Sequence, residues 1–357
     1  MQDRRPPPSP ARAVSPRHGG DLGDVTENSV FSGTWIDLST GINPWPYPLG
    51  EVPAARAARL PDAALLGDLG NAAARYYDAA GPDLVVAAPG SEALIQLLPR
   101  LVLPARVAIL SPTYSGHAPA WRAAGHEVAR VADLDALEGA RVDFAVATNP
   151  NNPDGARLDP ARLENIAAGF GARGGLLVVD EAFADTEPSL SLARKVGMPG
   201  LVVLRSFGKF FGLAGLRLGF ALAAPDLAAR ITAALGPWPV SGPAAWIATR
   251  AFADRAWIEA TQRRLAASAA RLDGILRAGG LEIVGGTSLF RLAASPRAPE
   301  IDAALRAHGL YARRFPERED WLRFALPPDA HAEARLAAAL ASVDAARTPL
   351  HAFEVSP

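Results

Sequence analysis

The chain has 357 residues, of which 49% are hydrophobic and 20% charged, and its formal net charge is -1. This composition is typical of a globular protein with ample material for a core, and it provides no whole-chain attraction to nucleic acid or to an anionic membrane. Because the chain has no cysteine, it has no disulfide, thiolate metal ligand or catalytic thiol, and we expect a reducing compartment and no metal site.

The N-terminal region has no pattern of a signal peptide, and no stretch approaches the roughly 18 apolar residues of a membrane helix. We therefore expect a cytoplasmic protein. Residues 1–16 are rich in proline, arginine and serine and are predicted to form a disordered tail. Glycines 19 and 20 and the prolines of segment 35–48 forbid a long helix, so residues 17–50 are predicted to form an N-terminal arm.

Short apolar runs alternate with helical patterns from residue 83 onward. The runs cover residues 84–88, 107–110, 144–147, 176–179, 201–204 and 218–222. Such alternation predicts an α/β structure with a mostly parallel sheet, and the uniformly apolar runs indicate strands covered on both faces. Residues 51–240 are therefore predicted to form a large domain around this sheet.

The remaining residues, 241–357, are predicted to form linking helices and a small C-terminal domain. The linking helices are expected at 241–254 and 256–279. After them, an α+β pattern predicts strands at 281–284, 289–293, 310–313 and 321–326. Helices are predicted at 299–307 and 329–346.

Lysine occurs only at Lys195 and Lys209, although the chain contains 36 lysine and arginine residues together. Lys209 lies in the apolar, glycine-rich segment 206–220. Unlike a guanidinium, its amine can lose a proton and attack a carbonyl group to form a Schiff base. A solvated surface lysine is the ordinary alternative, but these surroundings favour a chemical role.

The apolar run ending at Ala88 leads into Gly90-Ser91-Glu92, a turn followed by a helical pattern. Unpaired amides at a helix start suit an anion such as phosphate, although a simple helix cap is the alternative. Ser206 and Arg217 flank Lys209 in sequence and could supply a hydroxyl and a guanidinium to the same phosphate.

Three further side chains follow predicted strands. Tyr114 could stack on a flat aromatic cofactor or pack in the core. Asn152 lies in a polar, proline-rich segment at the carboxyl edge of the sheet, where open α/β sheets bind ligands; an ordinary turn is the alternative. Asp180 ends an apolar run, and a buried carboxylate needs a cationic partner, either a protonated pyridine nitrogen or an arginine.

Taken in order, these segments are similar to those of the fold type I pyridoxal-phosphate enzymes of the aminotransferase class I and II superfamily, over about residues 35–326. The resemblance implies an α/β fold with a mostly parallel, seven-stranded-type sheet, a smaller C-terminal α+β domain, and pyridoxal 5'-phosphate as cofactor. It implies that Lys209 holds the cofactor as a Schiff base, Asp180 pairs with the pyridine nitrogen and Asn152 binds the phenolic oxygen. The other cofactor contacts that it implies are Tyr114 on the ring, with Gly90, Ser91, Glu92, Ser206 and Arg217 around the phosphate.

The resemblance also assigns substrate contacts. Arg323 falls where family members keep the arginine that pairs with the substrate α-carboxylate. The arm looks like that of the subfamily that converts L-threonine O-3-phosphate to (R)-1-amino-2-propanol O-2-phosphate and carbon dioxide in cobalamin biosynthesis, so Gly41, Ile42 and Asn43 are expected near the substrate. For the phosphate of this substrate we predict His18 and the Arg313-Arg314 pair, with Arg314 as a binding residue.

Two alternatives remain at this point, and two positions depart from the superfamily pattern. An aminotransferase acting on histidinol phosphate or a related amino acid would use the same core residues, and a non-catalytic ligand-binding module could share the fold. Phe183 stands where many relatives have a tyrosine that touches the cofactor. Leu60-Pro61-Asp62 replaces a Tyr-Pro-Asp element that reaches the partner subunit's cofactor in the homodimer that the resemblance implies.

Overall fold

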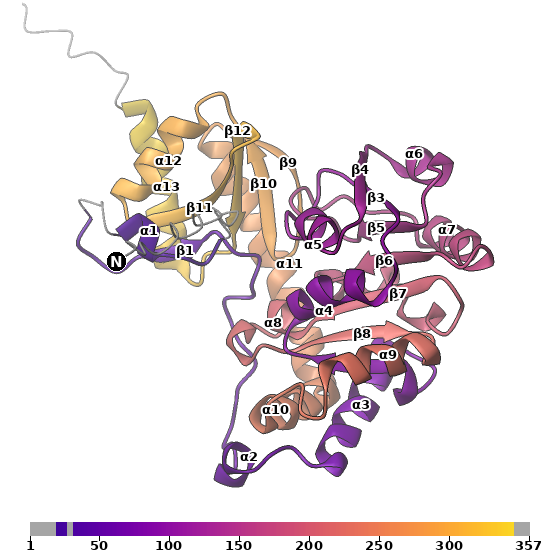
Figure 1. The fold of residues 1–357 in the computed structure, drawn as a ribbon. Helices are drawn as coiled ribbons and strands as arrows, with labels where there is room; N and C mark the ends of the chain where they lie inside the picture. The colour runs from indigo at the N-terminus through magenta and orange to yellow at the C-terminus, as the bar shows by residue number, and fades with distance from the viewer. Residues whose placement is uncertain (1–18, 27–30, 346–357) are drawn as a thin grey trace, which may run out of the picture.

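The structure, a computed structural model, describes residues 19–26 and 31–345 (Figure 1). The predicted tail at residues 1–16 and the predicted substrate residue His18 lie outside the described residues. The described residues form two sheets, of seven and five strands. In this part of the chain, no helix has the length and apolar character needed to cross a membrane.

The larger sheet has the strand order β2-β8-β7-β6-β5-β3-β4. β8 runs antiparallel to both of its neighbours, and the other pairs are parallel. This architecture confirms the predicted fold class, with a mostly parallel seven-stranded sheet. The strands are β2 (Val85–Ala88), β3 (Arg106–Leu110), β4 (Glu127–Val131), β5 (Phe144–Thr148), β6 (Leu176–Asp180), β7 (Leu201–Ser206) and β8 (Gly219–Ala223).

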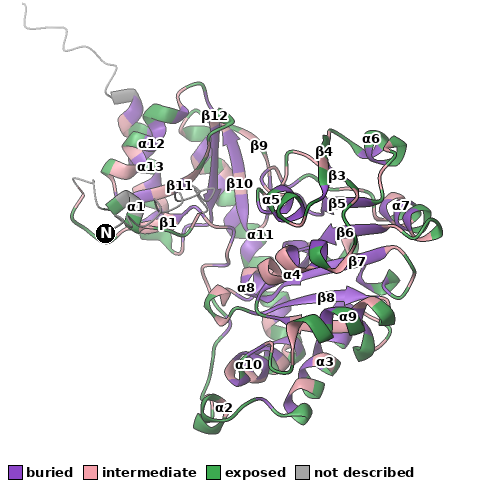
Figure 2. Ribbon diagram, in the orientation of Figure 1, coloured by how far each residue is buried: buried purple, intermediate pink, exposed green. Residues whose placement is uncertain are grey.

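Every residue of β5, β6, β7 and β8 is buried, as Figure 2 shows for the centre of the larger sheet. In β6, Leu177 and Val179 pack into one apolar cluster and Val178 into a second, because successive strand residues point to opposite faces. The apolar runs of the sequence thus reflect a sheet covered on both faces. The helices around it are α3 (Ala63–Tyr77), α4 (Ser91–Leu97), α5 (His117–Ala123), α6 (Leu134–Gly139), α7 (Pro160–Ala172), α9 (Pro225–Leu235) and α10 (Gly242–Ala253).

The smaller sheet has the order β1-β11-β12-β10-β9. Its strands are β1 (Ile36–Leu38), β9 (Glu282–Thr287), β10 (Phe290–Ala294), β11 (Leu310–Phe315) and β12 (Arg318–Ala325). The sequence does not reveal β1, which belongs to the predicted arm and pairs in parallel with β11. The remaining helices are α1 (Gly23–Thr26), α2 (Ala54–Ala58), α8 (Phe207–Phe210), α11 (Arg255–Ala278), α12 (Ala298–Ala307) and α13 (Ala330–Ala345). The division of the chain at residues 50 and 240 stays a prediction.

A buried ionic cluster joins the ends of β6 and β7. Arg205 Nη1 donates to Glu181 Oε2 at 2.8 Å, and Arg205 Nη2 donates to Asp185 Oδ1 at 2.5 Å. The three side chains are 4%, 0% and 1% exposed, respectively. Ser191 and the amide of Leu192 also donate to Glu181. Glu181 directly follows β6, and Arg205 lies on the adjacent parallel strand β7. The cluster neutralises charges that burial would otherwise make costly.

Replacing Arg205 with methionine should lower the free energy of unfolding by about 3–5 kcal/mol, because Glu181 and Asp185 would be left buried without a cation. Urea unfolding of the variant measures this loss. The control is Arg318→Met, which removes an exposed ion pair with Asp320 and should leave the urea midpoint almost unchanged. Equal midpoints for both variants would contradict the structural role of the cluster.

Candidate active site

The carboxyl ends of the parallel strands meet at one edge of the larger sheet. Asp180 ends β6, Ser206 ends β7, and Asn152 and Tyr114 lie shortly after β5 and β3. β2 reaches the same edge because Ala88 and Ser206 both pair with Gly219 at the start of β8. The strand pairing therefore brings together side chains that are far apart in the sequence.

Lys209 lies on α8, directly after β7. Its Nζ is 5.9 Å from the centre of the Phe183 ring. Burial lowers the pKa of Lys209 to about 8, with repulsion by Arg323 and Arg217 acting in the same direction and Asp180 acting against it. The amine therefore reaches its neutral, nucleophilic form near neutral pH, as Schiff-base chemistry requires.

Asp180 has a partner that the sequence did not suggest. His117 Nε2 lies 3.0 Å from Asp180 Oδ2, and the amide of Ala182 donates to Oδ1. Both side chains are buried. Sequence reasoning expected a pyridine nitrogen or an arginine, and the available signal was that His117 lies three residues after Tyr114 at the same sheet edge. His117 fixes the orientation of the Asp180 carboxylate, and a carboxylate held in this way is suited to pair with the protonated pyridine nitrogen of a cofactor.

The guanidinium of Arg217 lies over Gly90. A Cβ at Gly90 would come within 2.8 Å of Arg217 Nη2, and Gly90 has a φ of 87°, which favours glycine. The amide of Ser91 lies beside Gly219, where a Cβ would also clash with it. The Arg217 guanidinium and the Ser91 amide therefore lie beside Gly90 and Gly219, where any larger residue would clash with them. We call this set of residues the cradle, and its donors suit a phosphate.

Tyr114 and Glu92 contact each other at the side of the site. The Tyr114 hydroxyl donates to Glu92 Oε2 at 2.9 Å, and Gln96 donates to the other carboxylate oxygen. Burial, together with the nearby Glu92 carboxylate, raises the pKa of Tyr114. The ring of Tyr114 also lies edge-on to His117, with 5.8 Å between the ring centres. Glu92 thus fixes the orientation of the aromatic ring that we predicted to stack on a cofactor.

Arg323 is held by two segments, one that follows β5 of the larger sheet and one that follows β1 of the smaller sheet. Its Nη1 donates to Asn152 Oδ1 at 2.5 Å, and its Nη2 donates to the carbonyl of Ser39 at 2.7 Å. Its Nε is buried without a hydrogen-bond partner among the described residues. Burial and repulsion by Arg313 lower the pKa of Arg323 to about 10, against attraction by Asp37. A buried cation with neutral partners and an unused donor is suited to binding an anion.

The arm packs directly against the lysine. The amide of Asn43 donates to the carbonyl of Lys209 at 3.0 Å, and its side chain donates to the carbonyl of Phe210 at 2.8 Å. A Cβ at Gly41 would come within 2.8 Å of the Phe183 ring, so this close contact requires glycine. Ile42 lines a cavity of about 350 Å³ next to the end of β12. Gly41 and Asn43 therefore contact the segments that carry Phe183 and Lys209, whereas none of the predicted cofactor residues lines the cavity beside Ile42.

Arg314, which we predicted to bind the substrate phosphate, does not lie beside Arg323, because the strand register turns its side chain to the other face. Arg313 pairs with Arg323 across β11 and β12, so these two side chains share a face of the sheet. Arg314 points to the opposite face, where its guanidinium is 3.5 Å from Asp302 on α12. Arg313, which is half-buried and makes no carboxylate ion pair within the described part of the chain, replaces Arg314 as the candidate anion-binding residue.

Phe183 and Leu60 are the two positions that depart from the superfamily pattern. Phe183 makes apolar contacts, and Leu60 is exposed. The ring of Phe183 packs edge-on against Phe290, with 5.0 Å between the ring centres, and forms an apolar wall beside Lys209. Leu60 is 64% exposed. Asp62, two residues later, begins α3 by accepting a hydrogen bond from the amide of Leu65. The wall explains part of the desolvation that lowers the pKa of Lys209.

The chain is similar to known proteins over most of its length. Residues 54–342 match the family model described as aminotransferase class I and II. The chain is 46% identical to a threonine-phosphate decarboxylase of Sinorhizobium sp, covering 92% of this chain and 98% of the relative. It is 43% identical to a threonine-phosphate decarboxylase of Pseudomonas aeruginosa, covering 90% and 96%. A solved histidinol-phosphate aminotransferase of Sinorhizobium meliloti, in complex with pyridoxal-5'-phosphate, superposes with a TM-score of 0.73 at 26% identity, covering 87% and 90%.

Replacing Lys209 with methionine should stabilise the cofactor-free protein at pH 7 by about 1–3 kcal/mol, because an ammonium among apolar groups and arginines is removed. The folded-state pKa of about 8 is below the ordinary value of 10.5, so the unfolded chain binds the proton more tightly and the penalty is complete below pH 8. The gain should shrink as the pH rises from 8 to 10.5, which urea unfolding at several pH values measures. The other lysine serves as control: Lys195→Met removes an exposed pair with Glu164 and should not stabilise the protein. A gain that does not change with pH would contradict this reasoning.

Proposed function

Because the chain belongs to the aminotransferase class I and II family, we propose that it is a pyridoxal-phosphate-dependent carboxy-lyase that converts L-threonine O-3-phosphate to (R)-1-amino-2-propanol O-2-phosphate and carbon dioxide, a step in cobalamin biosynthesis. The observation that carries the proposal is the match, over nearly the whole chain, to two relatives that bear the name of this activity. The site supports it with two arginines, Arg323 and Arg313, on one face of the smaller sheet. A substrate with a carboxylate and a phosphate needs two such cations.

The proposed cofactor contacts use the residues described above. The cofactor, when bound, accepts the electrons released as a bond to the substrate Cα breaks. Lys209 tethers it, Asp180 holds a proton on the ring nitrogen with the support of His117, and Asn152 binds the phenolic oxygen. The cradle of Gly90 and Arg217 takes its phosphate, together with Ser91 and Ser206.

We assign Lys209 a second role as the acid that returns a proton to Cα after carbon dioxide leaves. A pKa near 8 allows the amine to hold or release a proton near neutral pH, which is the condition for efficient general acid–base catalysis. The apolar wall of Phe183 and Phe290 excludes water from the same region. Together these features favour protonation by the lysine over protonation by solvent.

The position of Arg323 determines which bond to Cα breaks. Because Asn152 and the carbonyl of Ser39 fix the guanidinium, the substrate carboxylate is held in one place relative to the cofactor. Arg313 lies next to Arg323 across the strands, and we propose that it binds the substrate phosphate. His18, also proposed earlier for this phosphate, is outside the described residues.

An aminotransferase is the second candidate, favoured by the similarity to the histidinol-phosphate aminotransferase of Sinorhizobium meliloti. The two full-length relatives are enzymes, so a non-catalytic module is not proposed. We further propose a homodimer, as is typical of the family, in which the exposed Leu60 lies near the partner subunit. A cytoplasmic location stays a prediction.

The purified protein with pyridoxal phosphate and L-threonine O-3-phosphate, without an oxo acid, should accumulate aminopropanol phosphate over many turnovers. Mass spectrometry detects the product. Lys209→Ala should form none, because both the tether and the proton donor are lost. If the wild type forms no product but yields glutamate from 2-oxoglutarate and histidinol phosphate, the protein is an aminotransferase.

Arg313→Met should raise the KM for L-threonine O-3-phosphate by about 10- to 100-fold, because a charge-assisted contact to the phosphate is lost. The response to unphosphorylated threonine should change little. The ratio of kcat/KM for the two substrates measures the effect. Arg314→Met is the matched control and should keep the wild-type ratio, since Arg314 faces Asp302. An unchanged ratio in Arg313→Met would remove Arg313 from the site.

A further inference from the structure

The segment that carries Asn152 also touches the smaller sheet through its backbone. We call residues 149–157 the Asn152 loop. Gly155 has a φ of 68° and packs against Gly286 of β9, whose φ is 149°. A Cβ at Gly155 would overlap the backbone of Gly286, and a Cβ at Gly285 would overlap the carbonyl of Asp154. The two backbones are therefore in direct contact, without intervening side chains.

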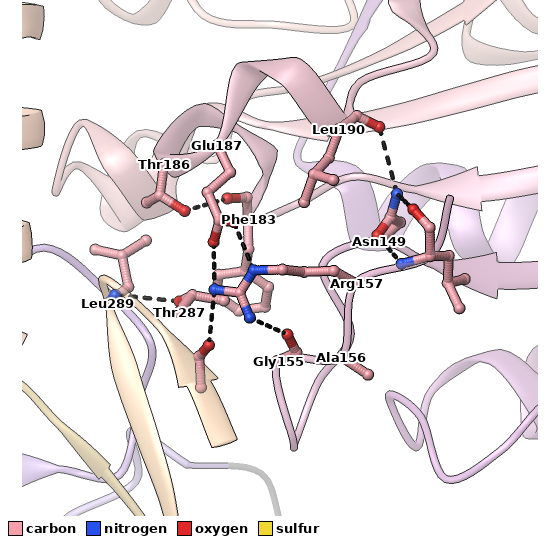
Figure 3. Close-up of polar contacts among 12 residues, drawn as sticks. Asn149, Gly155, Ala156, Arg157, Phe183, Thr186, Glu187, Leu190, Thr287 and Leu289 are labelled. Carbon is pink, nitrogen blue, oxygen red and sulfur yellow. Dashed lines mark hydrogen bonds and ion pairs between the residues drawn. The ribbon is translucent and has the colours of Figure 1, made fainter. Parts of the chain in front are cut away.

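Arg157, at the end of the loop, holds this contact together (Figure 3). Its Nε and Nη2 donate to the two carboxylate oxygens of Glu187 at 2.6 and 2.7 Å. Its Nη1 donates to the carbonyl of Gly155 at 3.0 Å, and Nη2 also reaches the carbonyl of Gly286 at 3.4 Å. One guanidinium thus joins the segment after β6, the turn of the loop and β9. We refer to this set of contacts as the Arg157 clamp.

The other end of the loop is fixed by Asn149. Its amide donates to the carbonyl of Asp180 at 2.9 Å, and its side chain bonds to both backbone groups of Leu158 and to the carbonyl of Leu190. Asn152 lies between this anchor and the Arg157 clamp, and it accepts the hydrogen bond from Arg323. The position of Asn152, and through it that of Arg323, depends on both ends of the loop.

The exposure of the clamp argues against a mainly structural role. The side chains of Arg157 and Glu187 are 48% and 27% exposed, and ion pairs at such sites contribute little to global stability. A bidentate pair with two further carbonyl contacts nevertheless gives strong geometric control. Its effect is therefore expected locally, on the loop and on β9.

We propose that Arg157 is a positioning residue for the carboxylate-binding site, which it orders by clamping the Asn152 loop between Glu187 and β9. The inference rests on the proposed function only in that Arg323 binds the substrate carboxylate. Without the clamp, binding must also order the loop, and this ordering reduces affinity more than it reduces the rate of the bound complex.

The test compares Arg157→Met with the wild-type holoenzyme. The KM for L-threonine O-3-phosphate should rise about 5- to 20-fold while kcat stays within about twofold. Without substrate, hydrogen exchange should accelerate at the amides of residues 154–158 and 283–287, and the urea midpoint should stay near that of the wild type. Glu187→Gln, which keeps an acceptor but removes the charge, should shift KM and exchange in the same direction by less.

Arg162→Met is the matched control, because Arg162 also pairs with exposed carboxylates, Asp135 and Glu138, but it joins α7 to α6 and has no hydrogen bond or ion pair with the Asn152 loop or β9 among the described residues. It should change neither KM nor exchange. Wild-type KM and exchange in Arg157→Met, a loss confined to kcat, or a large drop in its urea midpoint would each overturn the inference.

A wild type that makes no aminopropanol phosphate would instead refute the proposed function. The exchange comparison, and the dissociation constant for L-threonine O-3-phosphate measured from the cofactor absorbance, would still decide the role of Arg157.

Discussion

The parallel pairing of β6 with β5 and β7 brings Asp180, Ser206 and the loop of Asn152 to one edge of the larger sheet. Because the strands end at the same edge, Asp180, Ser206 and the loops after β3 and β5 are neighbours without any direct sequence signal for their contact. The same pairing turns Asp180 and Glu181 to opposite faces. One carboxylate meets His117 and faces the site, and the next is neutralised by Arg205 behind it. Two adjacent acidic residues thus have different partners, one at the candidate site and one in the buried ionic cluster.

The charge balance of the site explains what it can bind. Lys209, Arg217, Arg313 and Arg323 are the cations of this region, and Asp180 and Asp37 are acids that act on Lys209 and Arg323, respectively. Burial lowers the pKa values of Lys209 and Arg323, and repulsion among these cations lowers them further. An anion bound at Arg217 or Arg323 reduces the repulsion and makes the protonated form of Lys209 more accessible. Ligand binding and the proton affinity of the lysine are therefore coupled through ordinary electrostatics.

The sequence was sufficient to predict the features that depend on local patterns. Apolar runs located six of the seven strands of the larger sheet, but not β4, which lies at the edge of the sheet and is not apolar throughout. The polar residues after these runs located Asp180, Asn152 and Lys209 at the edge where the strands end. Contacts between distant residues left no such pattern: His117 meets Asp180 across 63 positions, and β1 is a strand of three residues that exists only through its pairing with β11. The choice between Arg313 and Arg314 depended on strand register, where a shift of one residue reverses the face. Arg157 carried no local signal, since an arginine after a turn is common on any surface.

The arm is attached both to the smaller sheet and to the helix that carries Lys209. Through β1 it is a strand of the smaller sheet, and through Asn43 it is bonded to the backbone of the helix that carries Lys209. Four residues, 39–42, separate these attachments, and a chain of that length spans at most about 3.5 Å per residue. The arm therefore limits the distance between the smaller sheet and the segment of Lys209. β1 cannot move far from the segment of Lys209 without breaking either its pairing with β11 or a backbone hydrogen bond.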